Sequence, residues 1–351
     1  MSKQLSEAWE LRGHRLPNRI CIPPMVIFGL SDETGMVTDG NVAHYTALAR
    51  GGAGLIIQEA TCVQPGGKLS PDQLGIWSDE HVPGLARIAE AVHAEGGTIL
   101  MQIHHAGVVG VAEEVVCPSA YATRRKTGRA MTAAEVEEMI AAFVAAGVRA
   151  QRAGYDGVEL HGCHRYLLSQ FFNARVNRRT DVYADPIVVV RRIFDGIRAA
   201  VPEDFIIGIR LGAFEPTLAD GIGHAQALAA MGMDFLDVSY GFVNESEPFK
   251  PEGFPFVDVV YAAGEIKKAV DIPVFAVNSI CTAAEAQGVL DLTDVDMVDI
   301  ARSALIDPAW PRHALAGEPA GKCLHCPGGC QWMKGQREKC PGLQLFARQN
   351  A

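Results

Sequence analysis

The 351-residue sequence has no long apolar run and no excess of basic residues, and each absence excludes a class of protein. No apolar stretch approaches the ~20 residues that span a bilayer, so we expect no membrane partner. The polar N-terminus, MSKQLSEAWELRG, lacks the apolar core of a secretory signal, which makes a cytoplasmic location the default expectation. The formal net charge of -10 disfavours nucleic-acid binding, because that function normally needs a basic face.

A glycine-rich dinucleotide fingerprint is also missing after the first apolar run, where the sequence reads PPMVIFG at 23–29. Its absence weakens an open, doubly wound sheet as the architecture. Hydrophobic residues make up 48% of the chain and charged residues 21%, which is enough for a large core. Eight short apolar runs, each typical of a strand buried on both faces, alternate with helical segments; they are 19–22, 54–58, 98–102, 157–160, 205–210, 235–238, 274–277 and 297–300.

Helix boundaries between these runs are marked by capping and by glycine. Thr132 and Glu135 have the spacing of a capping box and predict a helix over about 133–152. Glycines near 96, 154 and 232 follow helical segments just before the next strand, where helix ends favour glycine. Eight strand-then-helix units in a chain of this length predict an α/β fold, a (β/α)8 TIM barrel.

The ends of the candidate strands repeatedly carry an amide, an imidazole or a guanidinium. In chain order the residues at these ends are Pro24-Met25, Gln58-Glu59, Gln102 with His104 and His105, His161 with His164, Arg210, Ser239-Tyr240, Asn278-Ser279 and Ala301-Arg302. The active sites of TIM barrels lie at the C-terminal ends of the strands. Any one of these residues would be unremarkable at a loop edge, but their recurrence predicts a polar site at one rim.

The segment HGCHRY at 161–166 carries the most specific chemistry. His161 and His164 are two hydrogen-bond donors that can converge on one oxygen, and Tyr166 can supply a proton. This combination polarises a carbonyl group while another group delivers a hydride. The alternative interpretation is two structural histidines and a packing tyrosine.

Six motifs in this chain resemble those of the old yellow enzyme family, the FMN-dependent NADH:flavin oxidoreductases, in order and spacing. They are PPM at 23–25, EAT at 59–61, QIHHAG at 102–107, HGCHRYLLSQF at 161–171, NRRTDVY at 177–183 and ARSALIDPAWP at 301–311. The resemblance covers about 1–320 and implies that this range is an FMN-binding barrel acting on a small-molecule substrate. NAD(P)H or a redox partner protein would supply the electrons, and a homo-oligomer is one expected assembly.

The resemblance also implies a role for each site residue. The isoalloxazine ring would contact Pro24, Met25 and Ala60, with Gln102 bonded to its pyrimidine end and Arg210 stabilising its reduced form; the phosphate would lie near Asn278, Ser279, Ala301 and Arg302. His161 and His164 would hold the oxygen of an α,β-unsaturated carbonyl compound, and Tyr166 would protonate its α-carbon. The implied activity is that of an ene-reductase. An oxidative amine dehydrogenase or demethylase, or an electron-transfer subunit of a larger flavoprotein complex, stays open.

The chain departs from the family pattern at several positions. Val26 stands where the family has Thr or Cys, and Arg165 where it has Gly between His164 and Tyr166. Val108 replaces an Arg, and Asn278-Ser279 replaces a Gly-Gly pair beside the phosphate. These departures predict an unusual substrate. Arg165 either holds a carboxylate or phosphate on that substrate or is simply solvated.

Four of the nine cysteines crowd the C-terminus, at Cys323, Cys326, Cys330 and Cys340. Their spacing alone fits either a [4Fe–4S] cluster or a Zn site. The segment resembles that of the 2,4-dienoyl-CoA reductase and trimethylamine dehydrogenase subfamily, which implies an iron–sulfur segment over 321–351. In that subfamily nucleotide-binding domains follow the cluster, whereas this sequence stops at Ala351, so we expect them to be absent.

Overall fold

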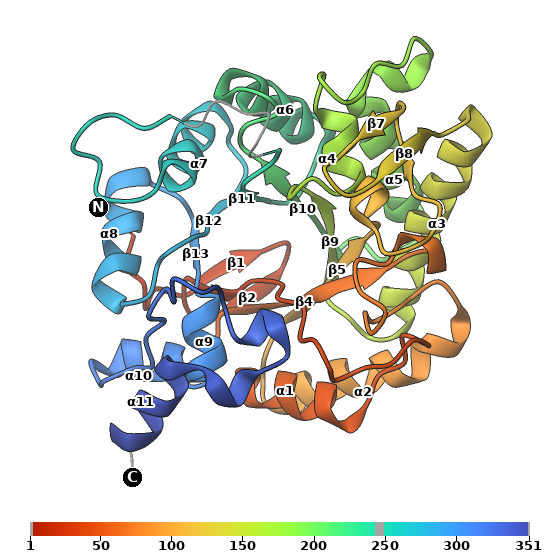
Figure 1. Ribbon diagram of the computed structural model, residues 1–351. Helices are drawn as coiled ribbons and strands as arrows, with labels where there is room; N and C mark the ends of the chain where they lie inside the picture. Colours follow the sequence, from red (N-terminus) through yellow and green to blue (C-terminus); the bar gives the residue numbers. More distant parts are fainter. Residues whose placement is uncertain (1–2, 243–248, 350–351) are drawn as a thin grey trace.

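A closed barrel of eight parallel strands forms the centre of the computed structural model, which describes residues 3–242 and 249–349 (Figure 1). The strand order around the barrel is β10-β11-β12-β13-β3-β4-β5-β9. The strands are β3 (Ile20–Ile22), β4 (Leu55–Cys62), β5 (Ile99–His104), β9 (Gly157–Gly162), β10 (Ile206–Gly212), β11 (Leu236–Ser239), β12 (Val274–Ala276) and β13 (Met297–Asp299). The predicted TIM barrel is confirmed, with each of the eight apolar runs contributing one strand.

Helices surround the barrel as an outer layer (Figure 1). They are α1 (Asp39–Arg50), α2 (Val82–Ala94), α3 (Ala133–Arg152), α5 (Pro186–Arg198), α6 (Leu218–Met231), α7 (Asp258–Ala269) and α8 (Ala283–Thr293). Shorter helices follow strands at the rim or end the chain: α4 (Leu167–Phe172), α9 (Arg302–Ile306), α10 (Trp310–Ala316) and α11 (Pro341–Gln349). The capping box of Thr132 and Glu135 opens α3 as predicted. No helix in the described part of the chain is long and apolar enough to cross a membrane.

Several strands run farther than the sequence predicted. β4 continues to Cys62 through an irregularity between Gln58 and Thr61, and β9 continues through His161 to Gly162. Arg210 lies inside β10, which ends at Gly212. The prediction ended these strands where the apolar run stops, but a polar side chain can point into the barrel while its backbone stays paired.

One end of the barrel is closed by apolar side chains. The hairpin of β1 (Trp9–Leu11) and β2 (His14–Leu16) packs Leu11 and Leu16 against residues inside the barrel, where the rings of Phe235 and Phe275 stack with centroids 4.6 Å apart. A second and larger apolar cluster lies between the strands and the helices. Because the N-terminal end of the barrel is filled with apolar groups, the polar residues gather at the opposite end.

The chain leaves the barrel after β5 and forms a small sheet before α3 begins. This sheet contains β6 (Val116–Cys117), β7 (Tyr121–Ala122) and β8 (Thr127–Ala130), in the order β6-β8-β7. β7 and β8 are antiparallel and are joined by a tight turn, in which the Thr123 amide donates to the Lys126 carbonyl at 2.8 Å.

Candidate active site

Barrel register brings the predicted site residues to adjacent positions on neighbouring strands. His161, Arg210 and Asp237 are direct neighbours across β9, β10 and β11, and Gln102 on β5 lies opposite Glu159 on β9. Gln102 donates to Glu159 through Nε2 at 2.7 Å. Polar residues that lie far apart in the sequence therefore form one continuous layer at the C-terminal end of the barrel.

Two adjoining cavities lie over this layer, with volumes of about 320 and 300 Å³. They share His164, Arg210, Ala301 and Arg302 as lining residues. The first cavity is also lined by Pro24, Met25, Ala60, Gln102, His161 and Tyr166, and the second by Asn278 and Ser279. The structure thus brings all the predicted catalytic and flavin-binding residues to one connected space, and Val26 also lines the first cavity.

The imidazoles form a hydrogen-bonded chain along the wall of this space. The Nδ1 atoms of His104 and His161 are 2.9 Å apart, and His161 Nε2 is 3.2 Å from His164 Nδ1. His164 Nε2 lies 2.7 Å from the Ser239 hydroxyl. Tyr166 packs edge-on against this chain, with its ring centroid 4.7 Å from that of His161. Both predicted histidines are therefore bonded to each other.

Burial sets the charge of these groups. It lowers the pKa of His164 to about 3, with Arg210 adding to the effect, and it lowers the pKa of His161 well below the ordinary value. Burial also raises the pKa of Tyr166 to about 12, helped by Cys163. At neutral pH the site therefore presents neutral imidazoles and a protonated phenol.

Arg210 is the buried cation of the site. Its Nε lies 3.2 Å from Asp237 Oδ2, and its Nη2 lies 3.9 Å from Asp299 Oδ2. Burial raises the pKa of both carboxyl groups, and Arg210 opposes that shift. Within the described residues the Arg210 Nε has no hydrogen-bond partner of good geometry, although it is shielded from solvent. An unsatisfied guanidinium beside a polar cavity fits an acceptor group on a bound flavin.

The backbone at Asn278 and Ser279 suits an anion as well. Both residues adopt positive φ, 102° and 59°, the region that glycine occupies most readily. The Gly-Gly conformation is thus available here although neither residue is glycine. Both residues line the second cavity together with Ala301 and Arg302.

The four C-terminal cysteines line a third cavity, of about 130 Å³, together with Arg302 and His325. His325 bonds to Arg302 Nη2 at 3.3 Å and to Cys281 Sγ at 3.2 Å. In the described part of the chain, the one group of three His, Cys, Asp or Glu ligand atoms within 4.8 Å of one another is His161, Cys163 and His164. No three of the four C-terminal sulfurs are therefore that close together.

Sequence reasoning did not place at this site several residues that the structure brings there. Asp237 and Asp299 flank Arg210, and their signal was a charged residue inside an otherwise apolar strand. Cys330, Trp332 and Met333 line the first cavity, although they come from the C-terminal segment. No local motif marks those contacts, because they depend on how that segment folds back over the barrel.

Comparison with known proteins gives a family. Residues 8–320 match the model of the NADH:flavin oxidoreductase / NADH oxidase family. An NADH oxidase of Thermoanaerobacter brockii is 39% identical over 338 residues, covering 89% of this chain but 51% of its own length, so this chain spans about half of that relative. An NADPH dehydrogenase of Halalkalibacterium halodurans is 33% identical over 323 residues, covering 90% of this chain and 94% of its own.

Solved structures share the fold. The old yellow enzyme homologue from Zymomonas mobilis superposes with a TM-score of 0.79 at 24% identity, over 96% of this chain and 99% of its own. The family match covers the strands that carry the imidazoles, Gln102 and Arg210. The chain belongs to the NADH:flavin oxidoreductase / NADH oxidase family and is an FMN-dependent oxidoreductase.

Proposed function

We propose that the two adjoining cavities hold FMN and an α,β-unsaturated carbonyl substrate, and that NAD(P)H is the electron donor. The main support for this proposal is that His161, His164 and Tyr166 line the same cavity as Gln102 and Arg210. When bound, FMN supplies the hydride for the activated C=C bond. Pro24, Met25, Ala60 and Gln102 would hold its ring and Arg210 its reduced form, with Asn278, Ser279, Ala301 and Arg302 at its phosphate.

His161 and His164 act as neutral donors to the substrate oxygen. Their pKa values are lowered by burial, so each ring carries one N–H at neutral pH. In the structure they bond to each other at 3.2 Å. A carbonyl oxygen entering the cavity replaces that bond and accepts from the rings instead. The histidines then withdraw electron density from the β-carbon and stabilise the negative charge that develops on oxygen.

Tyr166 is the proton donor to the α-carbon. Tyr166 lines the same cavity, and its pKa is raised to about 12, so its hydroxyl stays protonated at neutral pH. A phenol held beside the acceptor histidines can protonate one side of the reduced double bond.

The test replaces both donors. His161→Ala/His164→Ala is expected to abolish reduction of 2-cyclohexenone and keep the flavin spectrum, because the ring and phosphate contacts remain. The exposed Arg191→Gln variant, on α5, serves as the control and should keep full activity. Unchanged enone turnover by the double variant would rule the proposal out. Anaerobic titration of the wild type with NADH and then NADPH identifies the electron donor. If neither nucleotide reduces the flavin, a partner protein would supply the electrons.

For the C-terminal segment, we propose that residues 321–351 hold a [4Fe–4S] cluster through Cys323, Cys326, Cys330 and Cys340, outside a barrel of residues 1–320. The four cysteines line one cavity and none is in a disulfide. Tetrahedral Zn would hold its thiolate sulfurs about 3.8 Å apart, whereas no three of these sulfurs lie within 4.8 Å of one another. Four thiolates around one cavity match the ligand set of a [4Fe–4S] cluster.

Anaerobic purification followed by metal analysis tests the cluster. The expected content is about four irons per chain, lost on Cys326→Ser. Stoichiometric zinc without iron would contradict it.

Oxidation of an amine is the competing activity on this scaffold. The first cavity does carry the aromatic side chains of Phe28, Tyr166 and Trp332, which could surround a cation. The same cavity is lined by Arg210 and Arg302, whose positive charges repel one. Flavin reduction by trimethylamine, without enone turnover, would favour the amine reaction.

A further inference from the structure

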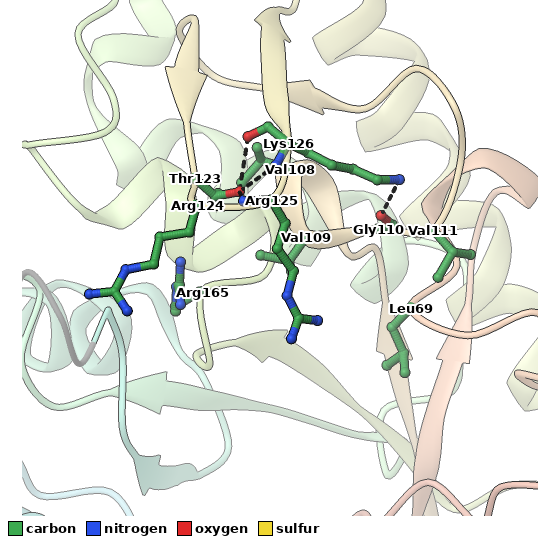
Figure 2. Close-up of a pocket in the computed structure, with 10 residues that line it drawn as sticks. All are labelled: Leu69, Val108, Val109, Gly110, Val111, Thr123, Arg124, Arg125, Lys126 and Arg165. Carbon is green, nitrogen blue, oxygen red and sulfur yellow. Dashed lines mark hydrogen bonds between the residues drawn. The ribbon is translucent and has the colours of Figure 1, made fainter.

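A larger cavity, of about 670 Å³, opens beside the proposed substrate cavity (Figure 2). Its lining residues are Leu69, Val108, Val109, Gly110, Val111, Thr123, Arg124, Arg125, Lys126 and Arg165. Leu69 lines both spaces, and Arg165 stands in the chain between His164 and Tyr166. The two cavities are therefore neighbours, and one molecule of moderate length can occupy both.

This cavity is strongly basic. Four cations line it, and of the described residues that line it none is acidic. Lys126 donates to the carbonyls of Gly110 and Ala112 at 3.0 and 2.6 Å. In the portion of the chain that the structure describes, Arg124, Arg125 and Arg165 have no carboxylate within ion-pair distance. Three guanidinium groups thus remain for a ligand.

Backbone hydrogen bonds fix the turn that carries two of the arginines. Arg124 and Arg125 form the tip of the β7–β8 turn, and Figure 2 shows their side chains extending toward the same side of the cavity as Arg165. Lys126 runs the other way, to Gly110, and ties this turn to the loop after β5.

Gln170 fixes the other wall. Its Oε1 accepts from the Val108 amide at 3.3 Å, and its Nε2 donates to the Arg165 carbonyl at 2.7 Å. Arg165 has φ of 67°, a conformation that glycine adopts more readily. Its guanidinium lies over the Phe242 ring, 5.6 Å from the centroid, and its buried Nε has no partner among the described residues. The basic cavity is therefore already formed, with donors that await an acceptor.

We propose that Arg124, Arg125 and Arg165 bind a carboxylate or phosphate on a molecule whose reactive end lies between His161 and Tyr166. This inference rests on the proposed function and adds an anionic class of ligand to it. Arginine forks bind carboxylate and phosphate oxygens in pairs, and the absence of acidic neighbours leaves that charge uncompensated. The anion belongs either to the unsaturated substrate or to the nicotinamide nucleotide.

The test uses matched acceptors, cinnamaldehyde and 4-carboxycinnamaldehyde, with the FMN-loaded enzyme. In Arg124→Gln/Arg125→Gln and in Arg165→Gln, the kcat/KM for the carboxylated aldehyde should fall about tenfold or more, mostly through KM. The neutral aldehyde should lose far less. Arg191→Gln, a remote exposed arginine on α5, is the matched control and should change neither value. Calorimetric titration of oxidised holoenzyme with the carboxylated aldehyde should show the same loss of affinity without turnover.

A second set of measurements varies the electron donor, NADH or NADPH, at a fixed concentration of cinnamaldehyde. A rise in the KM for NADPH with an unchanged KM for NADH would assign the site to the nucleotide 2′-phosphate. Equal losses for charged and neutral aldehydes, with both nucleotides unaffected, would overturn the proposal. If wild-type enzyme reduces neither aldehyde but still binds the carboxylated one through these arginines, the proposed function fails and the anion site stands.

Discussion

His104 and His161 meet nitrogen to nitrogen, with their Nδ1 atoms 2.9 Å apart inside the barrel. One Nδ1 must donate and the other accept, which fixes the tautomer of each neutral ring. If His104 donates, His161 donates in turn to His164, and His164 to Ser239. If Ser239 donates instead, every bond reverses. The donors offered to a substrate therefore depend on a residue, His104, that the substrate need not touch.

This dependence predicts the effect of replacing His104. His104→Leu leaves His161 Nδ1 without its partner, and we expect kcat/KM for 2-cyclohexenone to fall about tenfold while flavin stays bound. His104→Asn, whose amide can occupy the Nδ1 position, should recover part of the loss. Equal activity of the Leu variant and the wild type in steady-state assays would show that His104 does not orient the ring of His161.

The pH dependence should lack an imidazole titration. The pKa of His164 is lowered to about 3, so the ring gains its positive charge only in strong acid, and the pKa of Tyr166 is raised to about 12, so the phenol loses its proton only in strong base. A profile of kcat/KM for the neutral enone should be flat between about pH 5 and pH 9. A limb with an apparent pKa near 6.5 in the wild-type profile would contradict this expectation and indicate that an imidazole gains charge near neutral pH.

Tyr166→Phe separates protonation from binding. Loss of the hydroxyl should lower kcat for enone reduction by about a hundredfold, with a much smaller change in KM, because the proton is needed after the substrate is bound. The rate of flavin reduction by NAD(P)H, followed by stopped-flow absorbance, should be nearly unchanged. Wild-type kcat in this variant would mean that the α-carbon takes its proton from solvent and not from Tyr166.

Removal of Arg210 should affect both stability and flavin binding. Arg210→Met leaves Asp237 and Asp299 buried without their cation, and losing one member of a buried ion pair costs about 3–5 kcal/mol. We expect a lower thermal midpoint and weaker FMN binding in titration. Arg210→Met/Asp237→Asn should regain part of the stability but not the affinity. Recovery of both properties would show that the arginine serves the fold alone.

Much of the barrel could be predicted because each strand is a short apolar run and each helix carries its own end signal, as at Thr132 and Glu135. The site at the strand ends could also be predicted, since parallel strands present their ends at one rim. The hydrogen bonds among His104, His161 and His164 could not, because they depend on rotamers set by packing. The basic cavity could not be predicted either. It forms because the turn at Arg124 and Arg125 lies close to Arg165, and the sequence alone does not show that these segments are near each other.

Arg302 touches all three spaces of the site. It lines the flavin-ring cavity, the proposed phosphate cavity and the cysteine cavity, and it bonds to His325 at 3.3 Å. A residue shared by two binding sites can couple their affinities, and such coupling is reciprocal. If a ligand at the cysteine site raises the affinity for flavin by some factor, flavin raises the affinity for that ligand by the same factor. If the cysteines hold a metal as proposed, removing it would weaken flavin binding by the same factor by which removing flavin weakens the hold on the metal.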